Sequence, residues 1–136
     1  MTAAERLAAL AGRWRTVRAI RQADGALLRF AGDTIWQPEG DHMRCTETGT
    51  LGKDGQVFEA RRETLWAAAA DQAIDIRFAD GRPFHRLDAS GQADHDCPPD
   101  IYRLCYDFSA WPRWSVRWRV TGPRKAYRAL TRYRRP

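Results

Sequence analysis

The segment "RWSVRWRV", residues 113–120, alternates apolar and polar side chains without a break. Successive side chains of a β-strand point to opposite faces, so this alternation predicts a strand with one buried and one solvated face. The buried face carries Trp114, Val116, Trp118 and Val120, and the solvated face carries Arg113, Ser115, Arg117 and Arg119.

The same two-residue period continues through the chain after residue 12, with turn signals such as Asp24-Gly25, Asp80-Gly81 and Gly122-Pro123 at short intervals. These signals divide the chain into about ten strands. Strands joined by tight turns pair antiparallel, and closing the sheet removes its two free edges. The sequence therefore predicts an all-β fold, a closed antiparallel up-and-down barrel over residues 13–134, within one domain that spans residues 1–136.

A short helix is expected over residues 2–11, before the barrel. Thr2 and Glu5 have the spacing of a capping box, in which each side chain bonds to the backbone of the other. Gly12 suits the position after the last helical turn.

The composition is that of a folded domain with a bulky core, because six Trp, five Phe and four Tyr occur among 136 residues. No apolar run approaches the ~20 residues of a membrane-spanning helix, and the start of the chain does not resemble a signal peptide. Three cysteines, at positions 45, 97 and 105, form neither a disulfide framework nor a zinc motif. We expect a cytoplasmic protein with reduced thiols and no membrane span.

Positive charge is concentrated at the C-terminal end. Residues 111–136 hold eight arginines and Lys125 but no acidic residue, which gives +9, whereas the rest of the chain has 14 basic and 17 acidic residues. Of the 23 basic residues only two are lysine, a bias that GC-rich coding also produces. One outer face of the last two strands would carry a basic stripe of Arg117, Arg119, Arg128, Arg132 and Arg134. This stripe suggests an alternative function, the binding of nucleic acid or of an acidic partner. We do not expect nucleic acid, because the aromatic residues of these strands point inward.

Two features resemble the calycin barrels, which include the lipocalins, the fatty-acid-binding proteins and the nitrobindin-like proteins. "LAGRWRTV" places Gly12 and Trp14 at the start of the first strand, and "YRALTRYRR" ends the chain rich in arginine. The resemblance implies that Trp14 packs across the barrel base and that a closing-strand arginine, Arg132 or Arg134, lies over it. The whole chain, including "GRPFHRLD" and "YDFSAWPRW", also resembles an uncharacterised bacterial domain family.

A barrel of about ten strands has room for a ligand, so inward-facing positions become candidate binding positions. If Leu87 points inward, then His85 does as well, and placing Asp94 and Asp96 in water turns His95 and Cys97 inward. The candidate ligand-binding residues are Arg62, His85, His95, Tyr102, Tyr106, Trp118, Tyr127 and Tyr133. An inward Arg62 needs a partner, because an unpaired buried charge is costly. That partner is either Glu47 or the carboxylate or phosphate of a ligand.

These residues favour the binding or sensing of a small, partly apolar and anionic molecule in the barrel lumen. Haem binding and acid-base catalysis by His85 or His95 with a tyrosine are further alternatives. No catalytic residue and no metal ligand is assigned, since neither a nucleophile motif nor a metal-ligand spacing occurs. The sequence indicates no particular cofactor. It also does not fix the oligomeric state, for which a dimer is one alternative.

Overall fold

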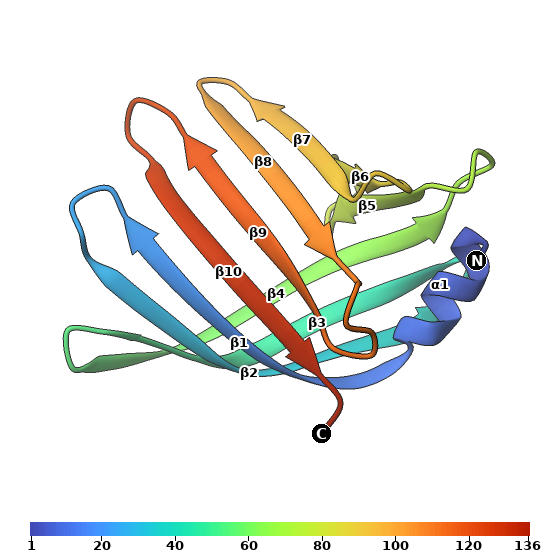
Figure 1. The fold of residues 1–136 in the computed structure, drawn as a ribbon, viewed down its shortest axis with the longest axis horizontal. Helices are drawn as coiled ribbons and strands as arrows, with labels where there is room; N and C mark the ends of the chain where they lie inside the picture. Colours follow the sequence, from blue (N-terminus) through green and yellow to red (C-terminus); the bar gives the residue numbers. More distant parts are fainter.

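The computed structural model describes residues 1–136, and it consists of one short helix and one ten-stranded antiparallel sheet that curls into a barrel (Figure 1). The predicted all-β architecture is therefore confirmed. Hydrogen-bonded neighbours follow the order β6-β5-β4-β3-β2-β1-β10-β9-β8-β7. The elements are α1 (Ala3–Leu10), β1 (Gly12–Gln22), β2 (Leu27–Glu39), β3 (His42–Lys53), β4 (Gln56–Ala68), β5 (Ile74–Phe78), β6 (Pro83–Leu87), β7 (Gln92–Cys97), β8 (Asp100–Asp107), β9 (Trp114–Thr121) and β10 (Ala126–Arg134).

The barrel is nearly closed rather than closed. The first and last strands pair along their length, from Arg15 opposite Arg134 to Gln22 opposite Tyr127. The sheet instead ends at β6 and β7, between which no ladder of backbone hydrogen bonds forms. Side chains bridge this seam, since the rings of Phe84 on β6 and His95 on β7 lie 5.2 Å apart.

Aromatic side chains fill the end of the barrel beside α1, which we call the base. Trp36 contacts Trp66 at a ring-centroid distance of 5.3 Å and Trp114 at 5.7 Å. Tyr133 stacks on Trp114 at 3.9 Å. Leu7 and Leu10 of α1 belong to the same buried cluster, so the helix caps the base. No helix of the structure has the length and the apolar character needed to cross a membrane.

Trp14 joins the helix, the first strand and the chain end. Its side chain is fully buried, and its indole Nε1 donates a hydrogen bond to the carbonyl oxygen of Leu10 at 2.8 Å. The guanidinium carbon of Arg135 lies 3.9 Å from the ring centroid, and Arg135 donates hydrogen bonds to the carbonyl oxygens of Ala9, Ala11 and Arg13. The bonds to Ala9 and Ala11 satisfy carbonyls that the end of a helix leaves without partners, and the bond to Arg13 ties the same side chain to the start of β1.

The arginine over Trp14 is thus Arg135, and the expectation of Arg132 or Arg134 is wrong. Both of those side chains point outward from β10, because Tyr133 between them points inward. Gly12 explains how Arg135 reaches the ring. Its φ of +101° favours glycine, and a Cβ there would lie 3.1 Å from Nη1 of Arg135.

Two glycines bring β2 and β3 unusually close. Gly32 and Gly49 are directly opposite in the ladder, and a Cβ on either would overlap backbone atoms of the facing strand. The ring of Phe30 lies over Gly49, where a side chain would displace it. Phe30 in turn supports Arg18, whose guanidinium carbon is 5.3 Å from its ring centroid.

Candidate functional site

The inner face of the barrel is buried at the base and accessible at the opposite end. Along β4, Trp66 and Thr64 are buried, the side chain of Arg62 is 42% exposed, and Phe58 is 51% exposed. The β1–β2, β3–β4 and β9–β10 hairpins extend away from α1 at this open end (Figure 1). A molecule in solution therefore meets the inner face at the hairpin end.

A buried ion pair crosses the lumen above the aromatic base. Arg18 donates two hydrogen bonds to the carboxylate of Glu47, at 2.8 and 2.6 Å, and a third from Nε to the Thr131 hydroxyl at 2.6 Å. The two charged side chains are only 10% and 6% exposed. Burial alone would raise the pKa of the Glu47 carboxyl, but the hydrogen bonds from Arg18 and the charge of Arg62 outweigh it and lower that pKa. Glu47 is therefore ionised and fully engaged at neutral pH.

Sequence reasoning missed Arg18. It follows Trp14 and Thr16 at the same two-residue spacing, so extending the alternation along β1 would have placed it inside. The abundance of arginine elsewhere in the chain hid this signal.

Arg62 is the second arginine of the inner face, and it is poorly neutralised. Its Nη2 is 3.5 Å from an oxygen of Glu47, and no other carboxylate lies within salt-bridge distance. Its guanidinium carbon lies 5.0 Å from the ring centroid of Trp118. Arg18 already binds both oxygens of Glu47, so Arg62 has no carboxylate of its own. The two arginines and one glutamate together carry one net positive charge.

His85 lies deeper and forms a neutral pair with Tyr106. Its Nε2 is 2.6 Å from the Tyr106 hydroxyl, and both residues are buried. Burial, with a smaller effect of His95 and Arg62, lowers the pKa of His85 to about 3. Burial raises the pKa of Tyr106 well above its ordinary value. Acid-base catalysis requires a group that gains and loses a proton near pH 7. Neither His85 nor Tyr106 does so readily.

These side chains surround a small cavity of about 30 Å³. It is lined by residues that include Arg62, His85, Tyr106, Trp118 and Tyr133, all of which were candidate ligand-binding positions. A space of this size holds a water molecule rather than an organic ligand. Three nitrogens of its lining residues are buried without a protein partner, namely Nδ1 of His85, Nε1 of Trp114 and Nε1 of Trp118. The deep lumen is thus polar and almost filled.

The remaining candidates lie beside this cavity or nearer the open end. The half-buried ring of His95 contacts Tyr102 at a centroid distance of 5.6 Å, and Tyr102 contacts Trp118 at 6.4 Å. Tyr127, half-buried on β10, pairs in register with Val120 on β9. Together with Arg62 and Trp118, these rings form one continuous inner wall.

Cys97 lies on the same face of β7 as His95, but it is not covered and does not belong to that wall. The residue is exposed at the end of β7, an edge strand that has a hydrogen-bonded neighbour on one side only. All three cysteines are free, as expected. No group of three or more His, Cys, Asp or Glu side chains is placed to hold a metal ion.

A haem does not fit these residues. The Nε2 of His85 faces the Tyr106 hydroxyl instead of an open pocket, and the ring of His95 packs edge-on against Phe84. The cavity between the histidines and Trp118 is also far smaller than a porphyrin.

The fold resembles that of a solved protein with which the sequence shares little identity. The S-type phycobiliprotein lyase CPES from Guillardia theta superposes with a TM-score of 0.70 at 10% sequence identity, covering 100% of this chain and 93% of that chain. At this identity the likeness establishes a shared fold alone. No curated protein matches the sequence.

The expected membership of an uncharacterised family is also confirmed. The sequence profile of DUF6314, a family of unknown function, matches residues 10–135. The match begins at the end of α1 and includes every strand of the barrel. The protein therefore belongs to the DUF6314 family.

Proposed function

We propose that the protein binds a small, partly apolar molecule with an anionic group on the inner face of its barrel. The observation that carries this proposal is the excess positive charge of Arg62 on a wall of aromatic rings. The guanidinium is within reach of solvent, and its single carboxylate contact is long, at 3.5 Å to a Glu47 that Arg18 already holds. A carboxylate, sulfonate or phosphate of a ligand would neutralise it.

The size of the deep cavity restricts where the ligand lies. Binding sites for organic ligands typically have volumes of ~300–1,000 Å³, so the cavity of about 30 Å³ does not admit the body of such a ligand. The apolar part would instead pack at the open end, against the exposed Phe58 of β4 and the half-buried Tyr127 and Trp118 of β10 and β9. The phycobiliprotein lyase with the same fold is named for a pigment-protein substrate, which is consistent with a ligand-binding use of this barrel.

A matched pair of fluorescent probes tests the proposal. 1-Anilinonaphthalene-8-sulfonate carries a sulfonate, whereas N-phenyl-1-naphthylamine has the same ring system without charge. We expect Arg62→Gln to weaken binding of the sulfonate ~10-fold, about the contribution of one charge-assisted contact, and to leave the neutral probe unchanged. Fluorescence titration measures both dissociation constants.

Two controls locate the probe. Arg61→Gln removes the same charge from the neighbouring position of β4, whose side chain is exposed and points outward. Arg132→Gln removes a charge from the outer face of β10. Both variants should bind the sulfonate as the wild type does. If either control weakens binding as much as Arg62→Gln, or if Arg62→Gln has no effect, the anion does not bind inside the barrel.

A further inference from the structure

The outer face of the barrel carries arginines in register on four neighbouring strands. Arg21 on β1 is directly opposite Arg128 on β10, Arg128 is opposite Arg119 on β9, and Arg119 is opposite Arg103 on β8. All four are exposed. Since strands are ~4.8 Å apart, these residues, which we call the arginine row, span ~14 Å.

Like charges in direct opposition destabilise a sheet, and this molecule hardly neutralises them. Within the arginine row only Arg103 has a carboxylate partner, Asp94 at 3.2 Å. The predicted basic stripe is present and extends beyond β9 and β10. The outward-facing arginines of this region without any salt bridge are Arg21, Arg29, Arg113, Arg117, Arg119, Arg128, Arg132 and Arg134.

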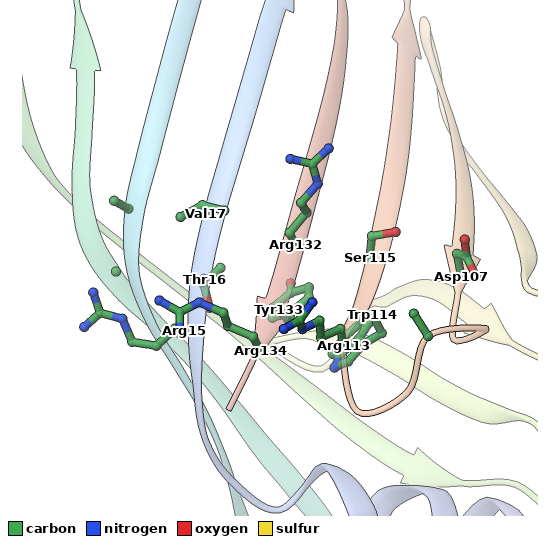
Figure 2. A pocket seen from close by; sticks show the side chains of 13 residues that line it. Arg15, Thr16, Val17, Asp107, Arg113, Trp114, Ser115, Arg132, Tyr133 and Arg134 are labelled. Carbon is green, nitrogen blue, oxygen red and sulfur yellow. The ribbon is translucent and has the colours of Figure 1, made fainter. Parts of the chain in front are cut away.

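Beside the arginine row lies an apolar patch. Leu130 is opposite Ala19, and Val17, which is 51% exposed, is opposite Ala31. Two shallow grooves of about 430 and 940 Å³ follow this face, and both are lined by arginines and by members of the patch. Figure 2 shows the smaller groove, in which Arg15, Arg132 and Arg134 stand around Val17. The face thus combines an apolar centre with an arginine rim, which is the usual anatomy of a protein-protein interface.

We propose that this outer face docks an acidic protein partner. Carboxylates of the partner would meet the arginine row, and its apolar side chains would cover Val17 and Leu130. A second copy of this chain is a poor occupant of the same face, because two arginine rows would repel each other. The phosphates of a nucleic acid would neutralise the arginines, but they would leave the apolar patch exposed. No aromatic side chain points outward from β1, β10, β9 or β8 to stack on a base.

The binding test uses a fluorescein-labelled helical peptide of 20 residues with glutamates flanking a leucine stripe. In fluorescence anisotropy at ~50 mM salt, where charges are weakly screened, we expect the wild-type protein to bind this peptide. The double variant Arg119→Gln/Arg128→Gln should bind at least ~5-fold more weakly, the effect of two exposed ion pairs. A peptide with the leucines replaced by serine should also bind more weakly.

The matched control is Arg61→Gln/Arg82→Gln, which removes two exposed positive charges from β4 and from the β5–β6 turn. It should bind the acidic peptide as the wild type does. The proposal is overturned if the peptide does not bind, if the control loses as much affinity as the row variant, or if the leucines make no difference. Tighter binding of a 20-base-pair DNA duplex than of the peptide would instead assign this face to nucleic acid.

A second measurement needs no partner. Arg128 lies between two other arginines, so Arg128→Gln should relieve repulsion and raise the thermal midpoint by ~2 °C at 10 mM salt. The difference should disappear at 0.5 M salt, where the Debye length is shorter than the spacing of the row. A midpoint that falls, or a rise that does not depend on salt, would show that repulsion between the arginines of the row does not destabilise the barrel.

Discussion

Replacing Trp14 by alanine should remove much of the stability of the barrel. The side chain is 0% exposed and contacts Trp111 and Trp114 at centroid distances of 5.5 and 6.0 Å. Truncating a buried tryptophan typically costs ~3–5 kcal/mol. The carbonyl of Leu10 also loses its 2.8 Å hydrogen bond, at a cost of ~1 kcal/mol or more if it stays buried. We therefore expect a loss of ~4–6 kcal/mol in the free energy of unfolding.

Urea denaturation followed by far-UV circular dichroism measures this loss. With an unfolding entropy of ~2 cal/mol/K per residue, it corresponds to a fall of ~15–20 °C in the thermal midpoint. Trp14→Phe retains a ring for Arg135 but cannot donate to Leu10, so it should lose only ~1–2 kcal/mol and remain measurable if the alanine variant does not fold. Trp111→Ala, at a residue 41% exposed, should lose less than Trp14→Ala. A loss below ~1 kcal/mol for Trp14→Ala would refute the conclusion that this side chain packs the base of the barrel.

Three other predictions concern buried groups. Glu47→Gln should lower the free energy of unfolding by ~3 kcal/mol or more, because it leaves the Arg18 charge unpaired, and urea denaturation should show a smaller loss for Glu63→Gln at the surface. The folded pKa of His85, about 3, lies below its value of 6.5 in the unfolded chain, so acid protonates the unfolded chain first. Stability should fall as the pH drops from ~6.5 toward 3, by up to ~1.4 kcal/mol per pH unit, and urea midpoints of His85→Gln should lack this contribution. Burial raises the pKa of Cys45 to about 12, so a thiol reagent at pH 8 should label Cys97 and Cys105 in the native protein and Cys45 only after unfolding.

The alternation of side chains predicted most of the fold because burial in a sheet depends on local parity. Trp114, Val116 and Val120 are buried and Arg117 is exposed, as the two-residue period requires. At Cys97 the alternation predicted the face of the strand but not the burial of the side chain. An inward position is covered only if other strands pack over it, and an edge strand near a turn has no such cover.

Contacts between distant residues could not be predicted in the same way. Arg18 and Glu47 are 29 positions apart, and their pairing depends on the register of β1, β2 and β3. Arg135 reaches Trp14 only because β10 pairs with β1 and the chain then turns back over the helix end. The family motif indicated that an arginine lies there, but the choice among three neighbouring arginines depends on the exit path of the chain.

The positions of the arginines in the barrel carry information that their number alone does not. GC-rich coding would favour arginine over lysine at a basic position, but it would not decide which positions are basic. Inside the barrel, each arginine lies on a ring and near a carboxylate, as Arg18 does with Phe30 and Glu47. Outside, Arg128 lies between two arginines, and no acidic residue follows Asp107 in the chain. A single carboxylate on β9 or β10 would relieve the repulsion, and the proposal of an anionic partner for the outer face predicts that these strands carry none.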